Sequence, residues 1–286
     1  MKFIKSYFSG INSTFSRLKI LSMLYVLTLI FALGVAIPFR GTISADIGSS
    51  MAAIKLLKDF DYTTYTNFMH LFGDTIQPLL KTAFLFGILY VIFFVFFSGG
   101  IISSIKNGTN SLSQFWADSW TYFSRFFRVF LYSFLSMIIV TLIVFFPTAA
   151  IIAAISDSVK SEATYFYIIC SALIIFLLLI SIIVLVSDYS KIMMTGNNAL
   201  RPFRTMLRAV SYIFKHFFSV YGMNLLFLIT GVALFVLYNI IADKYWMTSG
   251  ISIFIVFLIQ QIFVFIRIFL KISIYGGEVD LVKKLG

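Results

Sequence analysis

Several polar side chains lie within long apolar stretches, where an ionisable or amide group is costly and is therefore a candidate for function. Gln260, Arg267 and Lys271 are spaced i, i+7 and i+11 in the last stretch, so they share one face of a helix. Asn224, in the preceding stretch, and Asp188, at the end of an earlier one, are candidate partners for this polar stripe. Such a stripe is typical of a path for a solute or a lipid headgroup. Hydrogen bonds between helices, with the cations reaching toward the interface, explain the same residues without a path.

Asp188 calls for a basic partner. It follows the uncharged run Ala163 to Ser187, so its carboxylate lies at the edge of the hydrocarbon layer, where an unpaired charge is poorly solvated. Arg267 ends the last apolar stretch on the same predicted side, and a guanidinium can meet a carboxylate with two hydrogen bonds. We therefore predict that Asp188 pairs with Arg267. Lys191, one helical turn away, is the alternative partner.

Residues suited to covalent or metal chemistry form no recognisable pattern. The sequence has no H-E-x-x-H motif, Walker loop or G-x-S-x-G motif, and its single cysteine, Cys170, cannot form an intramolecular disulfide. His70 and Asp74 are one helical turn apart, with Asp59 and Asp61 upstream, which raises the hypothesis of a metal site. No second histidine or cysteine is near them, and carboxylates are common in surface loops. We expect no enzyme activity, no metal site and no cofactor.

The elements that must position these residues are membrane helices. Hydrophobic residues make up 60% of the chain and charged residues 12%, whereas roughly a quarter of the residues of a soluble domain are charged. Six uncharged windows each have about 20 or more residues, enough for a helix to span a hydrocarbon layer of roughly 30 Å. Their continuous apolar character favours helices over the alternating strands of a β-barrel. We predict an all-α polytopic bundle of six transmembrane helices at Ile20 to Phe39, Thr82 to Ile105, Val129 to Ser156, Ala163 to Ser187, Phe217 to Ala242 and Tyr245 to Ile266.

The first window raises the alternative of a signal-peptide core, because Lys2 and Lys5 precede it. Its long amino-terminal flank, its own length and the lack of an A-x-A site after it predict a retained helix instead.

Basic residues alternate along the chain in a way that predicts topology. Sixteen of the 22 Lys and Arg residues fall in the amino terminus, the second and fourth connections and the carboxyl end, and seven of the 11 acidic residues fall on the other side. Because basic residues in short loops resist translocation, we predict that both termini are cytoplasmic and that the loop Arg40 to Lys81 is extracytoplasmic. This bias also explains the net charge of +11 without nucleic acid as a partner.

Basic and aromatic residues lead into the fifth span at helical spacing. Arg201, Arg204, Arg208 and Lys215 fall in a sector about 60° wide, beside an apolar sector about 100° wide. Similar amphipathic segments precede the first and third spans. Such a helix lies in the headgroup plane, where each Lys or Arg contributes about 1 kcal/mol near an anionic leaflet, so we expect anionic membrane lipids as partners. Packing across the inner mouth of the bundle requires the same amphipathic pattern.

These lead-in segments indicate an internal repeat. Gly108 aligns with Gly196 without a gap in the residues that follow, and Phe15-Ser16-Arg17 recurs as Phe123-Ser124-Arg125. A shared composition of basic, Phe-rich segments is the alternative explanation. We predict a single transmembrane domain, 1–286, built from approximate units 1–100, 101–188 and 189–277, with the extracytoplasmic loop at 40–81. Each unit is expected to contain an amphipathic interfacial helix followed by a transmembrane hairpin.

A family resemblance rests on this architecture and on two short segments. These are LLKDFDYTTYTNF (Leu56 to Phe68) in the outer loop, where short helices are expected at Ser50 to Asp59 and Thr64 to Phe72, and SDYSKI (Ser187 to Ile192) at the end of the fourth span. Over nearly its whole length the chain resembles a group of uncharacterised bacterial six-span inner-membrane proteins and, more distantly, the membrane domain attached to some glycerophosphodiester phosphodiesterases. The resemblance implies a location in the bacterial inner (plasma) membrane. It does not imply phosphodiesterase activity, because the sequence carries no catalytic domain of that kind.

The expected function is that of a permease-like transporter, or of the membrane subunit of a transporter, acting without covalent catalysis. A membrane scaffold or lipid-organising protein is the alternative, indicated by the three interfacial helices. Either one is compatible with a protein partner or a homo-oligomer. A water-accessible cavity near Gln260 favours transport, and a dry, solid bundle favours the scaffold.

Overall fold

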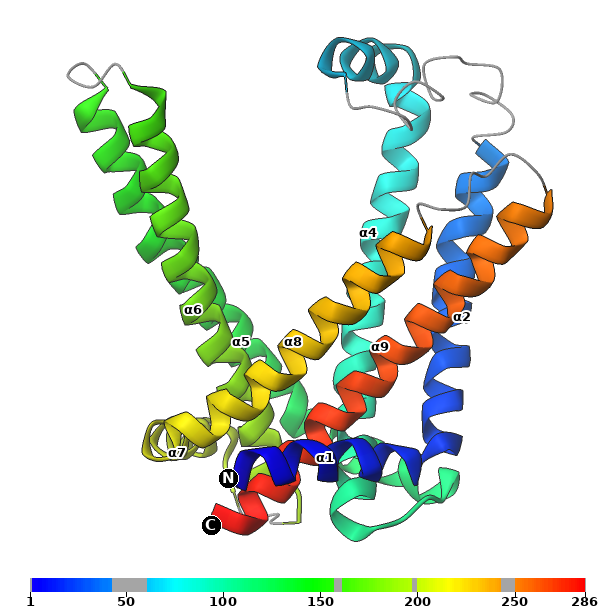
Figure 1. Ribbon diagram of the computed structural model, residues 1–286, viewed down its shortest axis with the longest axis vertical. Coiled ribbons are helices and arrows are strands. Elements are labelled where there is room, and N and C mark those ends of the chain that lie inside the picture. Colours follow the sequence, from blue (N-terminus) through cyan, green and yellow to red (C-terminus); the bar gives the residue numbers. More distant parts are fainter. Residues whose placement is uncertain (1, 43–60, 157–160, 197–199, 243–249, 286) are drawn as a thin grey trace. The chain divides into compact units, whose positions relative to one another are not determined.

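The computed structural model describes residues 2–42, 61–156, 161–196, 200–242 and 250–285. These residues form eight helices and no strand (Figure 1). The helices are α1 (Lys2–Phe15), α2 (Leu18–Thr42), α4 (Tyr62–Asn107), α5 (Leu112–Ile155), α6 (Glu162–Met194), α7 (Pro202–Lys215), α8 (Phe217–Ala242) and α9 (Gly250–Leu285). The predicted all-α fold is confirmed.

Six of these helices, α2, α4, α5, α6, α8 and α9, are long and apolar enough to cross a membrane, as predicted. The chain is therefore a multi-pass integral membrane protein. α4 has 46 residues and α5 has 44. At 1.5 Å per residue, each is about twice as long as a hydrocarbon layer of roughly 30 Å requires, so both helices extend beyond that layer.

Two of the three predicted lead-in helices are separate elements, and the middle one is not. α1 and α7 have 14 residues each. α7 begins with Pro202 in its first turn and ends at His216, whose φ of −117° and ψ of 31° interrupt the helix before α8. The lead-in before the third span is instead the first part of α5, which runs unbroken from Leu112 to Ile155.

The outer-loop prediction is correct in part. Thr64 to Phe72 is helical, but it belongs to the start of α4 and is not a separate helix. Asp61 precedes α4 and accepts a hydrogen bond from the Thr64 hydroxyl at 2.6 Å. Figure 1 shows α4 turning near its start, and Pro78 lies in this part of the helix. The helix predicted at Ser50 to Asp59 lies outside the described residues.

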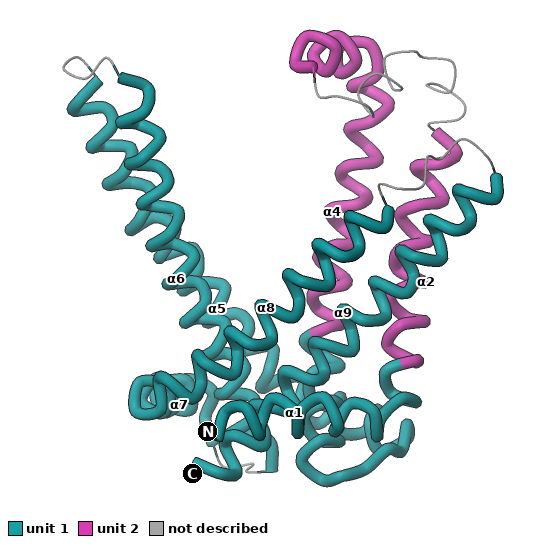
Figure 2. Tube along the Cα trace, in the orientation of Figure 1, with its two compact units in different colours: residues 1–21, 95–286 teal, residues 22–94 magenta. Residues whose placement is uncertain are grey.

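The chain divides into two compact units (Figure 2). Unit 1 comprises residues 1–21 and 95–286, and unit 2 comprises residues 22–94. Inside unit 2, the Phe31 ring of α2 lies 5.0 Å from the Phe93 ring of α4 and 6.4 Å from the Phe86 ring. Gly34 permits this approach, since a Cβ there would lie 2.5 Å from the Phe86 ring. Unit 2 is thus a helical hairpin held by aromatic contacts, and the three predicted repeat units stay a prediction.

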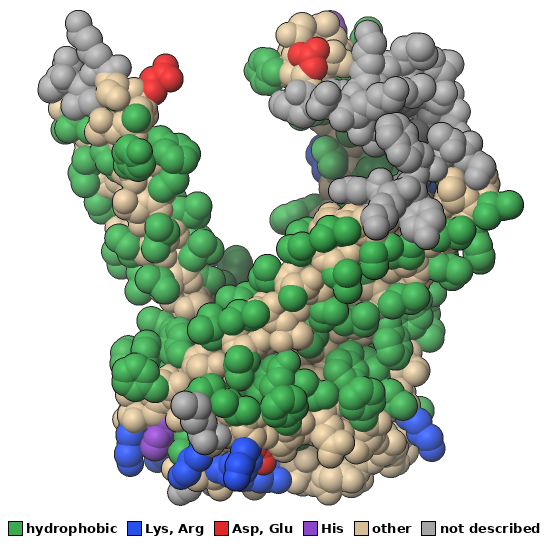
Figure 3. Space-filling model, viewed as in Figure 1, with side chains coloured by type: hydrophobic (Ala, Val, Ile, Leu, Met, Phe, Trp, Pro, Cys, Tyr) green, Lys and Arg blue, Asp and Glu red, His purple; other side chains and the backbone are tan. Residues whose placement is uncertain are grey.

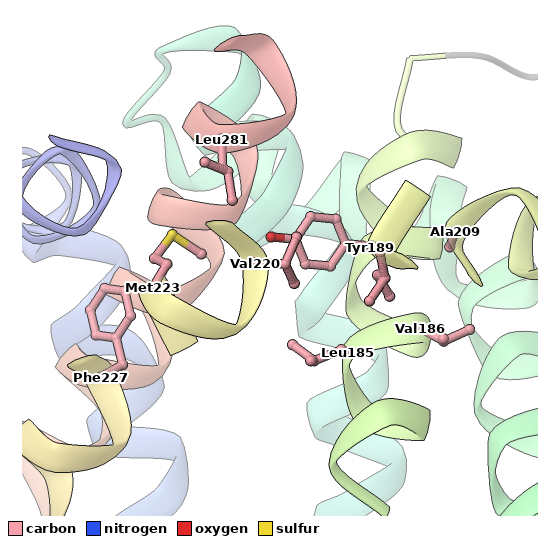
Figure 4. Close-up of a cluster of buried hydrophobic side chains, with 9 residues drawn as sticks. Leu185, Val186, Tyr189, Ala209, Val220, Met223, Phe227 and Leu281 are labelled. Atoms are coloured by element: carbon pink, nitrogen blue, oxygen red, sulfur yellow. The ribbon is translucent and has the colours of Figure 1, made fainter. Parts of the chain in front are cut away.

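The core of unit 1 joins four consecutive helices (Figure 4). Its buried members are Leu185, Val186 and Tyr189 of α6, Ala209 and Ile213 of α7, Val220, Met223 and Phe227 of α8, and Leu281 of α9. Burial of these side chains holds the carboxyl-terminal part of α6 beside α8 and α9. The charged residues described below lie on these same helices.

α1 packs against α9 through small residues. Ser6, Gly10 and Thr14 are the buried residues of α1 and recur every four positions. A Cβ on Gly10 would lie 2.3 Å from the Ser273 backbone oxygen, and the hydroxyls of Thr14 and Ser273 form a hydrogen bond of 2.9 Å. Backbones that approach this closely are typical of membrane helices crossing at small residues. The first helix therefore supports the last one directly.

Candidate functional site: a buried cluster of charged side chains

Unit 1 has one end that carries α1, α7 and both described chain ends, and we call it the basal end (Figure 1). Lys and Arg side chains gather there, whereas hydrophobic side chains cover the helices beyond it (Figure 3). α6 becomes buried as it reaches this end. Leu173 and Leu178 are 45% and 58% exposed, but Leu185 and Ile192 are 5% and 1% exposed. The part of α6 at the basal end is thus surrounded by protein.

Asp188 lies in this buried part of α6 and has three partners. Its carboxylate is 3.1 Å from the Lys191 ammonium and 3.3 Å from the Lys271 ammonium of α9. The Tyr275 hydroxyl donates a longer hydrogen bond of 3.4 Å to the same carboxylate. The Lys271 ammonium also lies 4.7 Å from the centre of the Tyr275 ring, which is a cation–π distance. Asp188 therefore links the second transmembrane hairpin to the third.

The prediction that Asp188 pairs with Arg267 is wrong. Within the described part of the chain, the cross-helix partner of Asp188 is Lys271, one helical turn further along α9, and Arg267 is exposed. The reason is the position of each residue along α9 relative to Asp188 on α6. Arg267 and Lys271 share a face, so a sequence pattern cannot tell which of the two reaches the level of Asp188. Lys191, the alternative partner, does bind Asp188 as well.

Glu278 and Tyr189 are buried next to this ion pair without hydrogen-bond partners. Both residues are 0% exposed. Neither carboxyl oxygen of Glu278 has a hydrogen bond of normal geometry among the described residues, and nor does the Tyr189 hydroxyl. The Asn224 amide of α8 interacts with the Glu278 carboxyl, but it donates its measured hydrogen bond, of 3.0 Å, to the Val220 backbone oxygen.

These residues form one electrostatic unit, which we call the charged cluster: Asp188 and Lys191 of α6 and Lys271, Tyr275 and Glu278 of α9. Glu278 interacts electrostatically with Asp188, Lys191 and Lys271. Burying ion pairs is costly and adds little net stability, so a cluster of this kind is weak evidence for a purely structural role. Ionisable groups inside membrane helices are functional candidates for the same reason.

The structure divides the predicted polar stripe. Gln260 and Arg267 are exposed on α9, whereas Lys271 and Asp188 meet in the charged cluster. Asn224 lies beside the cluster through its interaction with Glu278. The stripe is thus two exposed residues followed by a buried polar site at the basal end.

Sequence reasoning missed Glu278 and Tyr275 as members of the charged cluster, and Tyr189 as their buried neighbour. The uncharged window of the last span ends at Ile266, so the residues after it were treated as a basic carboxyl end. α9 in fact continues to Leu285. The signal was helical spacing, since Tyr275 and Glu278 follow Lys271 by four and seven residues and lie on its face.

α7 presents its predicted basic residues at the surface. Thr205, Ala209 and Ile213 are the buried residues of this helix and pack it on the bundle. The neighbouring apolar face is open, with Phe203 and Phe214 58% and 59% exposed. The exposed basic residues, which we call the basic edge, are Arg201, Arg204, Arg208 and Lys215. α7 therefore packs on protein with one face and leaves its aromatic and basic faces accessible.

Three further basic residues at the basal end bind the carboxyl ends of helices. Arg17 donates to the Ser104 oxygen of α4 at 2.9 Å, and burial lowers the pKa of its guanidinium from the ordinary value. Lys106 donates to the Thr195 oxygen, just after α6. Lys283 lies 3.5 Å from the Lys106 backbone oxygen. Cations at these positions satisfy carbonyl groups that have no partner within the helix and oppose the helix dipole.

Gly108 and Gly196 end two helices in the same way. Gly108, after α4, has a φ of +71°, and Gly196, after α6, has a φ of +87°. Glycine adopts this left-handed conformation without strain, which makes it the common residue after a helix end. These are the two glycines that the predicted repeat aligns, and the repeat itself stays a prediction.

Tyr212 connects α7 to the core beside the charged cluster. Its hydroxyl donates to the Leu281 oxygen of α9 at 3.5 Å, and its ring lies 5.6 Å from the Tyr189 ring of α6. Burial raises the pKa of Tyr212 to about 12. The phenol therefore stays protonated at physiological pH and adds no charge to the site.

Possible metal ligands do not gather in the described residues, which contain no group of three or more His, Cys, Asp or Glu side chains suited to a metal ion. Asp59, part of the metal hypothesis, lies outside them.

Comparisons with protein-family models, with curated proteins and with solved structures found no match to this chain. The family resemblance stays a prediction.

Proposed function

We propose that the chain is a permease-like transporter, or the membrane subunit of one, that acts without covalent catalysis. The observation that carries this proposal is the charged cluster, in which Asp188 of α6 binds Lys271 of α9 at 3.3 Å. This pair joins two transmembrane hairpins at one level of the bundle. Breaking and remaking it is a simple way to move one hairpin against the other, as alternating access requires.

The location that we propose is the bacterial inner membrane, with both termini cytoplasmic. Sixteen of the 22 basic residues fall in the segments assigned to that side. Lys2 and Leu285, the first and last described residues, lie at the basal end of unit 1, where Lys and Arg gather (Figure 3). The charged cluster then lies near the cytoplasmic surface, within reach of cytoplasmic water.

Uptake into liposomes tests the proposal. Purified protein is reconstituted and offered a panel of labelled amino acids, sugars and carboxylates. We expect at least one solute to enter faster than into protein-free liposomes, and Asp188→Asn and Lys271→Gln to abolish that excess. Arg267→Gln, on the same face of α9 but exposed, is the matched control and is expected to transport normally. If no solute enters above the protein-free rate, the transport proposal is wrong.

Loss of folding is a separate explanation for inactive variants. Tyr275→Phe addresses it, because this change keeps both charges and removes only the hydrogen bond to Asp188. We expect the Tyr275→Phe protein to fold and to transport more slowly than the original chain. A rate equal to that of the original would separate the charged cluster from transport.

A lipid-organising function is the second candidate, and the exposed faces of α7 favour it. Phe203, Leu207 and Phe214 are each more than half exposed beside the basic edge. Because the opposite face of α7 packs on the bundle, the helix is held in a fixed orientation at the membrane interface. Aromatic side chains would enter the headgroup region while the guanidinium groups bind anionic lipids.

A further inference from the structure

Glu278 is a fully buried carboxyl group that takes no part in the ion pairs of Asp188. It is 0% exposed, and both of its oxygens lack a hydrogen bond of normal geometry among the described residues. The two cations that interact electrostatically with Glu278, Lys191 and Lys271, are already bound to Asp188 at 3.1 Å and 3.3 Å. Glu278 therefore lies beside Asp188 and its two cations without an ion-pair partner of its own among the described residues.

The groups around Glu278 act in opposite directions: Lys191 and Lys271 attract an ionised carboxylate, whereas Asp188 repels it. Asp188, Tyr189 and Lys191 of α6, Lys271 and Tyr275 of α9, and the neutral Asn224 of α8 interact with it or lie on its face. α7 contributes Tyr212, whose ring packs against the Tyr189 ring. α1 meets this part of α9 through the Ser6 backbone and small side chains, which carry no charge.

A carboxylate in such a place is costly. A fully buried anion loses its hydration, and the negative charge of Asp188 repels it further. Lys191 and Lys271 replace that hydration only in part, because both are already bound to Asp188. The neutral acid avoids both costs. A carboxyl group that is neutral when the Asp188 pair is closed, and that becomes charged when water reaches it, is suited to carry a proton.

We propose that Glu278 is a proton-binding site and that its proton is the coupling ion of transport, an inference whose second half rests on the function proposed above. In the protonated state, Lys271 remains with Asp188. When the O–H bond of the carboxyl breaks and a water molecule at the basal end accepts the proton, the new carboxylate attracts Lys271.

The position of Lys271 makes this competition possible. Its ammonium lies over the ring of Tyr275, one turn along α9 toward Glu278, and it interacts electrostatically with both carboxyl groups. Deprotonation of Glu278 therefore weakens the link between α6 and α9. Proton binding restores that link.

Infrared spectroscopy of the purified protein tests the proton site. A protonated carboxylic acid has a C=O stretching band that a carboxylate lacks. We expect such a band at neutral pH, and we expect Glu278→Gln to remove it. Asp280→Asn is the matched control, because Asp280 lies two residues further along α9 and is paired with Lys284. A band that persists unchanged in Glu278→Gln overturns the proposal.

Chemical modification gives a second readout. Dicyclohexylcarbodiimide enters apolar regions and reacts with protonated carboxyl groups, forming an O-acylisourea that rearranges to a stable N-acylurea. We expect one adduct at Glu278 by peptide mass spectrometry and none at Asp280. The Glu278→Gln protein should fold, since glutamine has the shape of the neutral acid. Modification of Asp280 but not of Glu278 contradicts the site.

An imposed pH gradient tests whether proton binding at Glu278 drives the accumulation of solute. With a gradient imposed across the liposomes, the original protein is expected to accumulate its solute, and Glu278→Gln to equilibrate the solute without accumulation. Equal accumulation by the two proteins overturns the coupling role even when the infrared band belongs to Glu278. If the original protein moves no solute, the proposed function and the coupling role both fail, and the infrared result alone decides whether Glu278 binds the proton.

Discussion

The charged cluster and the basic edge of α7 are built from the same kinds of residue and differ in nearly every physical respect. In the cluster, Asp188 is 5% exposed and Lys191 is 7% exposed, and each charge has a partner of opposite sign. On α7, Arg201, Arg204 and Arg208 are exposed, beside aromatic side chains that are also exposed. One region has its counter-ions inside the protein. The basic edge of α7 is exposed, so its counter-ions come from solvent or from lipid headgroups.

This difference in burial indicates what each region interacts with. A buried ion pair depends on its partner, because removing one charge leaves the other in a poorly solvated place. An exposed cation is solvated by water and can be removed at little cost to the fold. Removing the charge of Asp188 or Lys271 should therefore change stability and transport together, and substitutions on the basic edge should change lipid binding alone.

The largest expected effect comes from Asp188→Asn. It leaves Lys191 and Lys271 without their shared carboxylate, and breaking a buried pair in this way costs on the order of 3–5 kcal/mol. The midpoint of thermal unfolding in detergent should fall clearly, and Arg267→Gln should leave it unchanged. An Asp188→Asn protein as stable as the original would mean that the cluster is hydrated and that the contrast with α7 is false.

A smaller loss is expected where α1 packs on the same stretch of α9 that carries the cluster, at Ser273 and Gly277. A methyl group on Gly10 would lie 2.3 Å from the Ser273 backbone oxygen, so Gly10→Ala must separate the two helices, at a cost of about 1–3 kcal/mol. Gly231→Ala is the control, because no atom lies within 4 Å of a Cβ there. It should change stability by less than about 1 kcal/mol. Equal effects of the two changes in thermal unfolding would exclude a tight α1–α9 contact.

Much of the fold could be predicted because its signals are local. Each span is a continuous apolar run, and the basic edge of α7 follows from helical spacing alone. The partner of Asp188 could not be predicted in the same way, because Arg267 and Lys271 differ by one turn and the choice depends on how deep α9 lies beside α6. Glu278 was missed because α9 remains helical well beyond its last uncharged window.

Contacts distant in the sequence were also beyond a pattern analysis. Ser6, Gly10 and Thr14 look unremarkable among the aromatic residues of α1, and nothing in the sequence pairs them with Ser273 of α9. The break between α7 and α8 and the continuity of α5 were equally beyond it, because neither junction contains a glycine or a proline. Pro202 in the first turn and the conformation of His216 bound α7.

The smallest effect on the fold is expected on α7, where the contrast predicts a change in lipid binding. Replacing Arg201, Arg204 and Arg208 together by Gln should alter the free energy of unfolding by no more than about 0.5 kcal/mol. It should weaken binding of anionic lipid by about 1 kcal/mol per residue, measured by native mass spectrometry of retained lipids. Replacement of all three by Lys keeps the charge and should keep most of the binding. Retention unchanged by the Gln variant would mean that α7 does not bind headgroups.

The Asp188–Lys271 pair joins α6 to α9, and a double-mutant cycle measures the energy of this link. Asp188→Asn and Lys271→Gln are measured singly and together by equilibrium unfolding in detergent, with Asp188→Asn and Arg267→Gln as the parallel cycle. We predict an interaction energy of about 0.5–3 kcal/mol for the first cycle and additivity for the second. Additivity in the first cycle would contradict the account, because Asp188 and Lys271 would then be independent.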